Sequence, residues 1–82
     1  MIVNGRMSEA EWVRTFKDNL IDIMEEQGYN QKQLAKESGL SEATISNYVT
    51  GKMVPSIKGV INLSKTFGIS LDEFLDFGYK LF

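Results

Sequence analysis

Residues 42–50 carry the side chains of this chain that are best suited to recognising a polar ligand. The segment places Ile45, Tyr48 and Val49 at helical spacing, with small or polar residues between them. A helix that buries these three residues turns the others outward, where carboxylate, amide and hydroxyl groups can form hydrogen bonds. The outward residues are Glu42, Ala43, Ser46, Asn47 and Thr50.

Catalytic chemistry has little support in the composition. The 82 residues include no histidine and no cysteine, which removes the commonest general base, the commonest metal ligand and every thiolate site. The adjacent carboxylates Glu25–Glu26 and Asp72–Glu73 fall in predicted helix turns, where solvated charge explains them. We therefore expect no enzyme, no cofactor, no metal site and no small-molecule substrate. The lack of cysteine suits a cytoplasmic protein, and we expect neither a membrane span nor a secretory signal.

Two helices and a turn must position the polar segment. Residues 31–38 predict the first helix, in which Ala35 is small enough for a steeply crossing helix to approach closely. Gly39 stands where that helix stops and reverses, a position that commonly needs a positive φ. Ser41 is a strong N-cap for the second helix, and Gly51 closes it.

Residues 31–51 resemble the helix-turn-helix of the phage-repressor and Cro type, also called the Xre family of bacterial regulators. The resemblance extends over about residues 16–75. The chain departs from the family pattern in two ways, because no arginine follows Gly51 and the first recognition position is the acidic Glu42. The matching residues are Gln31, Leu34, Ala35, Gly39, Leu40, Ser41, Ile45, Tyr48, Gly51, Pro55 and Ser56.

Capping patterns predict the remaining helices, and no strand pattern occurs. Ser8 and Glu11 form a capping-box pattern at the start of a helix that ends at Gly28. Asn30 and Gln33 can form a second capping box for the helix over residues 31–38. Ser56 caps a helix over residues 57–67, and a capping box of Ser70 and Glu73 opens a short last helix. Gly59 within the fourth helix indicates either a close approach or simple tolerance.

These helices predict an all-α, five-helix, repressor-like domain over residues 8–76. An arm precedes it at residues 1–7, and an apolar tail follows at residues 77–82. We expect Trp12 and Phe16 of the first helix to lie in the core. The inward face expected for the fourth helix is Ile57, Val60, Ile61, Ser64 and Phe67.

The resemblance implies a sequence-specific DNA-binding transcriptional regulator, and a repressor in particular, whose helix over residues 42–50 reads the major groove. Asn47 can pair with adenine, Glu42 can accept from cytosine N4, and the methyl groups of Ala43 or Thr44 can contact thymine. Glu42 has a second explanation, since an acidic residue also stabilises a helix N-terminus. The expected base-reading residues are Glu42, Ala43, Thr44, Ser46 and Asn47.

The resemblance also places the N-terminus of the helix over residues 31–38 against a DNA phosphate. Gln31 can in addition brace Glu42 across the motif. Lys32 and Lys36 are equally consistent with phosphate contact and with simple solvation. The expected phosphate-binding residues are Asn30, Gln31, Lys32, Ser41, Thr50, Lys52 and Lys58.

The charge distribution leaves two functions open. Residues 31–66 hold five lysines against two glutamates, a net charge of +3, as phosphate contact requires. Residues 7–27 hold two basic and six acidic residues, a net charge of −4. That acidic segment supports an alternative, a protein-interaction module of the same fold such as an antitoxin or an antirepressor-binding partner.

The family usually binds DNA as symmetric dimers, so the resemblance implies a homodimer on an inverted-repeat operator. Its contact surface could be the last helix together with residues 77–82, which include four large apolar residues. The same tail could instead fold back onto the first helix against Trp12. The sequence does not decide between these two placements.

Overall fold

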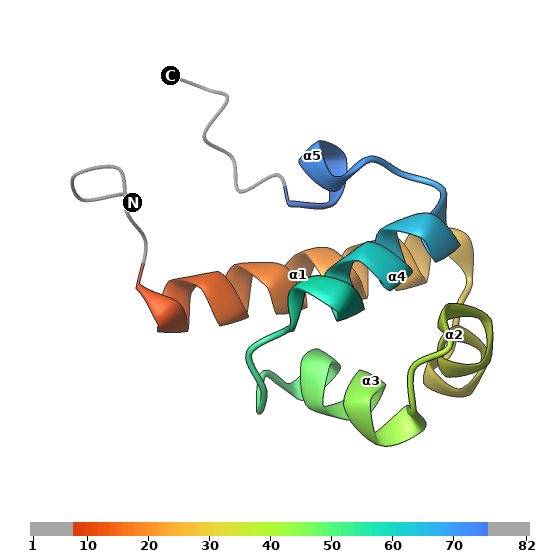
Figure 1. The fold of residues 1–82 in the computed structure, drawn as a ribbon, viewed down its shortest axis with the longest axis horizontal. Coiled ribbons are helices and arrows are strands. Elements are labelled where there is room, and N and C mark those ends of the chain that lie inside the picture. Colours follow the sequence, from red (N-terminus) through yellow and green to blue (C-terminus); the bar gives the residue numbers. More distant parts are fainter. Residues whose placement is uncertain (1–7, 76–82) are drawn as a thin grey trace.

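Five helices joined by short loops make up the described part of the chain (Figure 1). The structure is a computed structural model that describes residues 8–75. This part contains no strand, so the predicted all-α class is confirmed. The arm predicted at residues 1–7 and the tail predicted at residues 77–82 lie outside the described residues. The helices are α1 (Glu9–Gln27), α2 (Gln31–Ser38), α3 (Glu42–Thr50), α4 (Ile57–Phe67) and α5 (Leu71–Phe74).

The long helix α1 crosses the middle of the fold, and the shorter helices surround it (Figure 1). Helix α3 contacts both α1 and α2, α2 also contacts α4, and α4 contacts α5. The helix that carries the polar segment is therefore supported from two directions, and its outer side is left uncovered by the described helices.

The ends of the helices follow the capping residues of the sequence. Each helix begins after a serine or asparagine whose side chain accepts the backbone N–H three residues ahead. Gly39 and Gly51 end α2 and α3 with φ of 77° and 73°, a left-handed conformation that a Cβ would strain. The capping box predicted at Ser70 is half wrong. Ser70 Oγ accepts from the Glu73 N–H at 3.1 Å, but the Glu73 carboxylate does not return the bond.

The first capping box also has an electrostatic effect. The backbone N–H of Ser8 donates to the Glu11 carboxylate at 3.0 Å, and the Glu11 N–H donates to Ser8 Oγ at 3.1 Å. Because the bond from the Ser8 backbone, together with one from its side chain, favours the charged carboxylate, the pKa of Glu11 lies below its usual value.

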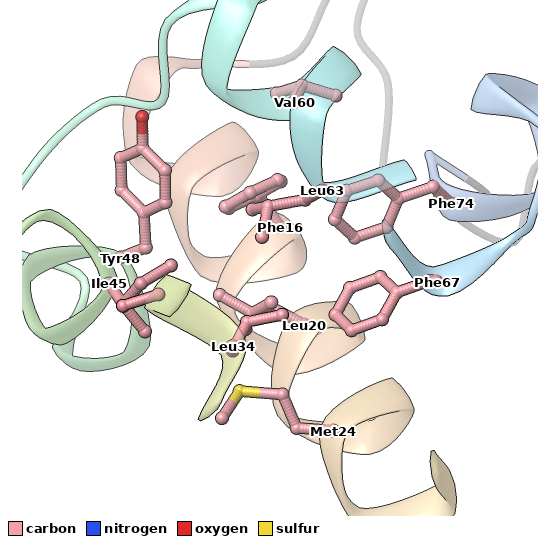
Figure 2. Close-up of a cluster of buried hydrophobic side chains, with 11 residues drawn as sticks. Phe16, Leu20, Met24, Leu34, Ile45, Tyr48, Val60, Leu63, Phe67 and Phe74 are labelled. Carbon is pink, nitrogen blue, oxygen red and sulfur yellow. The ribbon is translucent and has the colours of Figure 1, made fainter. Parts of the chain in front are cut away.

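One hydrophobic core joins all five helices (Figure 2). Phe16 of α1 lies at its centre, with ring centroids 5.6 Å from Tyr48 of α3 and 5.3 Å from Phe74 of α5. Side chains of one long helix thus hold both α3 and α5. The core residues are Phe16, Leu20, Met24, Leu34, Ala35, Ile45, Tyr48, Val60, Leu63, Phe67 and Phe74.

Two expectations about the core need correction. Trp12 is only half-buried and packs at the edge of the core, against Phe16. Ile57 is 78% exposed, whereas Leu63, which was not included in the expected face, is fully buried. Helix α4 turns the row Val60, Leu63 and Phe67 inward, and its first turn points Ile57 to the rim of the core.

Polar side chains of α1 complete the ends of the later helices. Asn19 Nδ2 donates to the Phe74 carbonyl at 3.1 Å, and Gln27 Nε2 donates to the Phe67 carbonyl at 2.9 Å. These carbonyls belong to the last turns of α5 and α4, where no intrahelical donor is available. Throughout residues 8–75, no buried side-chain nitrogen or oxygen lacks a hydrogen-bond partner. None of the helices in this range combines the length and apolar character that crossing a bilayer requires.

Candidate nucleic-acid interface

The outer face of α3 brings the predicted base-reading residues together. Ile45 and Tyr48 are 0% and 3% exposed and fix which side of the helix faces the core. Glu42 and Ala43 are exposed on the first turn, and Asn47 is half-exposed one turn later. Thr44 and Ser46 are likewise half-exposed, so none of the five predicted side chains is lost to the core.

Two hydroxyl groups predicted to bind phosphate already donate their protons within α3. Ser41 Oγ donates to Thr44 Oγ1 at 2.9 Å and accepts from the Thr44 N–H at 3.0 Å. Thr50 Oγ1 donates to the Ser46 carbonyl at 2.8 Å. Since a phosphate oxygen needs a donor, Ser41 and Thr50 would have to redirect their hydroxyl protons to bind one. In this geometry both stabilise the ends of α3.

The N-terminus of α2 keeps free donors for an anion. Asn30 Oδ1 accepts from the Gln33 N–H at 2.8 Å, and the Gln33 side chain accepts from the Asn30 N–H at 3.2 Å. The N–H groups of Gln31 and Lys32 lie in the first turn, where a helix has no internal acceptor for them. They lie at the positive end of the helix dipole, and the exposed Asn30 side chain carries a further donor there, its amide nitrogen.

The predicted brace between Gln31 and Glu42 is not present. No hydrogen bond joins these two side chains within the described residues, and both are exposed. Each lies in the first turn of its own helix, where water can satisfy it. Their side chains are therefore both available to a ligand.

Contacts that the sequence did not reveal hold α2 and the turn. The Tyr29 hydroxyl donates to Glu37 Oε1 at 2.7 Å, which raises the pKa of Tyr29 because the bond favours the neutral phenol. The Tyr29 ring also lies 5.8 Å from that of Phe67. In the turn, the buried Ser38 hydroxyl accepts from the Leu40 N–H at 3.3 Å. A serine immediately before the helix-ending glycine is the only sequence signal for this last contact.

Tyr48 fixes α3 against the start of α4. Its hydroxyl accepts from the Ser56 N–H at 3.4 Å and lies directly against Gly59. A Cβ on Gly59 would collide with that hydroxyl. Of the two explanations for Gly59, the close approach is therefore confirmed.

Exposed basic side chains come from α2, from α4 and from the loop after α3. Those of the expected positive segment are all exposed, and they are Lys32, Lys36, Lys52, Lys58 and Lys65. Arg14 and Lys17 of α1 share with Lys52 an open hollow of about 450 Å³ beside the C-terminus of α3, which Glu9 also borders. Arg14 and Lys17 were not among the predicted phosphate-binding residues, because residues 7–27 were assessed by their net charge of −4. Their spacing of three residues, which places both on one helix face, was the available signal.

A helix-turn-helix family model matches residues 20–74, which include the whole of α2, α3, α4 and α5. The chain belongs to the helix-turn-helix family. The resemblance found on residues 31–51 is thereby confirmed. Within residues 8–75 this helix-turn-helix protein has no group of carboxylates that could hold a metal ion.

Curated relatives of this helix-turn-helix protein include the HTH-type transcriptional regulator PuuR of Escherichia coli (strain K12) and that of Shigella flexneri. Each is 38% identical over 55 residues, which are 67% of this chain and 30% of the relative. The chain thus spans under a third of the length of these relatives. The replication factor C small subunit of Methanocaldococcus jannaschii is 25% identical over 72 residues, 87% of this chain and 4% of that protein. No solved structure matches.

Proposed function

We propose that this helix-turn-helix protein is a transcriptional regulator, acting as a repressor, that reads DNA sequence in the major groove with α3. The observation that carries the proposal is the division of α3 between a buried side, held by Ile45 and Tyr48, and an outer side with Glu42 and Asn47. The family match supports DNA as the ligand of that outer side. Two relatives named as transcriptional regulators support the biological role.

Base reading is assigned to five residues of α3. The Asn47 amide forms a bidentate pair with adenine, and Glu42 accepts from cytosine N4. The Ala43 side chain and the Thr44 methyl contact thymine, while Ser46 can bond either kind of base. Thr44 acts through its methyl because its oxygen accepts from Ser41. Each good pair contributes about 1–3 kcal/mol of discrimination.

Phosphate binding is assigned to the helix end and the cations around α3. The α2 N-terminus supplies the Gln31 N–H and the Asn30 amide, with Lys32 beside them. Lys52 follows the C-terminus of α3 and shares a hollow with Arg14 and Lys17, while Lys58 lies in the first turn of α4. Ser41 and Thr50 contribute only if their hydroxyl protons turn away from Thr44 and Ser46.

We further propose that two copies bind an inverted repeat. One α3 reaches only a few base pairs, which is too little for specificity in a genome. Two symmetry-related copies of α3 placed about 34–36 Å apart reach successive major grooves on one side of the duplex.

The proposal is tested by selecting bound duplexes from a random pool at two salt concentrations. We expect an inverted repeat to emerge. Asn47→Ala should relax one position in each half-site at a cost of about 1–3 kcal/mol, because the bidentate pair is lost. Gln31→Ala should weaken binding to all sequences alike, because phosphate contacts carry no sequence information.

Asn62→Ala on α4 is the matched control, since it makes the same chemical change outside the proposed interface. It should leave both the selected sequence and the affinity unchanged. Recovery of no sequence, with weak binding that disappears at modest salt, would contradict DNA reading. That result would favour the protein-interaction module instead.

The contribution of α1 has its own test in the salt dependence of binding. Lys17→Gln and Lys52→Gln should each make the slope of the logarithm of the DNA association constant against log salt concentration less negative by about 0.9, because each removes one phosphate contact. Lys65→Gln, an exposed lysine with no assigned contact, should leave the slope unchanged. A slope that becomes shallower for Lys52→Gln but not for Lys17→Gln would remove α1 from the interface.

A further inference from the structure

An apolar groove lies on the fold between α1, α4 and α5. It encloses a hollow of about 120 Å³ and is lined entirely by apolar residues. They come from the first half of α1, from the start of α4 and the loop before it, and from α5 with the residue that follows it. The lining residues are Trp12, Pro55, Ile57, Val60, Ile61, Leu71 and Leu75.

Two large apolar side chains at the rim of this groove are unusually exposed. Ile57 is 78% exposed and Leu71 is 42% exposed. Neither residue belongs to the core or to the partly buried residues that pack against it. The free energy falls when another apolar group covers apolar surface of this kind, because that surface is removed from water.

The chain itself supplies a fitting occupant. Leu75 lines the groove and is the last described residue, so residues 76–82 begin at the groove's own edge. In this segment Phe77, Tyr79 and Leu81 alternate with Gly78 and Lys80. Alternation of this kind puts the three apolar side chains on one side of an extended chain.

We propose that residues 76–82 dock in the groove of their own chain, with Phe77, Tyr79 and Leu81 against the side that carries Trp12 and Ile57. At about 3.3 Å per residue, the segment can extend over roughly 23 Å, enough to follow the groove from Leu75 to the first turn of α4. Asp76, Gly78, Lys80 and the last residue, Phe82, fall on the side that faces water.

The same chain is favoured over a second copy as the source of this segment. Since only Asp76 separates Phe77 from the groove residue Leu75, docking within one chain has an effective concentration in the millimolar range or above. A segment from a second copy competes only when the protein concentration approaches that value. The tail is then part of each folded monomer, and the dimer of the proposed function must form through other surfaces.

Trp12 makes the proposal measurable, because it is the only tryptophan and it lines the groove. In the full chain carrying Phe77→Ser, Tyr79→Ser and Leu81→Ser, its emission should shift to longer wavelength and its quenching by acrylamide should increase. Asp76→Ser with Lys80→Ser should change neither. Both results should hold at every protein concentration, and DNA is absent, so the test is independent of the proposed function.

A disulfide provides a second test that does not depend on how stable the serine variant is. The chain has no cysteine, so Ile57→Cys with Tyr79→Cys can form only one pair within a chain. Oxidation should join them, since docking brings the two positions within the roughly 7 Å between Cα atoms that a disulfide allows. The product should keep the mass of one chain under non-reducing conditions. Ile57→Cys with Lys80→Cys, on the opposite side of the segment, should react more slowly.

Three results would overturn the proposal. The first is equal quenching of Trp12 in the wild-type chain and the triple serine variant. The second is protection of Trp12 only at concentrations where light scattering detects a dimer. The third is a cysteine pair that gives only two-chain products or no disulfide at all.

Discussion

Replacing Phe16 by alanine is expected to lower the free energy of unfolding by about 3–5 kcal/mol. Phe16 is 1% exposed, and its ring contacts those of Trp12, Tyr48 and Phe74. The substitution therefore leaves a cavity where α1, α3 and α5 meet. Because small domains are stable by only about 5–15 kcal/mol, much of the variant should be unfolded at moderate temperature. Urea denaturation followed by circular dichroism measures the loss.

Val54→Ala is the control for this substitution, since it removes apolar atoms from an exposed loop residue. It should change the free energy of unfolding by no more than about 0.5 kcal/mol. If Phe16→Ala were as mild as Val54→Ala, the aromatic cluster would not be what joins the three helices.

Gly59→Ala is expected to destabilise the protein by about 1–3 kcal/mol, as overpacked cores do. The new Cβ would collide with the Tyr48 hydroxyl and would also approach Ser56 Oγ to 3.2 Å. Tyr48 has little room to yield, because it is 3% exposed and its ring packs edge-on against Phe16. The loss should outweigh the gain of about 1 kcal/mol that alanine normally brings to a helix interior.

A double-mutant cycle isolates the cause of that effect. Tyr48→Phe removes the colliding hydroxyl, so Gly59→Ala should cost at least 1 kcal/mol less in this background than in the wild type. Gly68→Ala serves as the comparison, since Gly68 has open space around it and is strained only through its φ of 71°. Tyr48→Phe should not relieve that substitution. Equal costs of Gly59→Ala in both backgrounds would assign the effect to something other than Tyr48.

The helices were predictable from sequence because their limits are set locally. Ser41 and Gly51 mark the ends of α3 through hydrogen bonds to residues within four positions. The residue types that form such local bonds can be recognised in the sequence. Which face of α4 turns inward was not predictable, because Ile57 and Leu63 have similar side chains and only the packing of other helices distinguishes them. The contact between Tyr48 and Gly59 is likewise tertiary, and sequence could only raise it as one of two explanations.

Some features of the candidate site were predictable from the sequence, and others were not. The outer face of α3 follows from helical geometry once Ile45 and Tyr48 are recognised as inward. The engaged hydroxyl protons of Ser41 and Thr50 depend on rotamers that a sequence does not specify. The hollow shared by Lys17 and Lys52 joins positions 35 residues apart, so only the crossing of α1 and α3 could reveal it.

The two sides of α3 have a consequence for evolution. Ile45 and Tyr48 keep the helix in place, whereas Glu42, Ala43 and Asn47 have side chains that take no part in the core. Mutations at the outer positions are therefore nearly free of selection for folding, while those at the inner positions are not. Under the proposed function, lineages that inherit this scaffold change target through a handful of codons. A laboratory library restricted to those codons should retain folded members almost throughout.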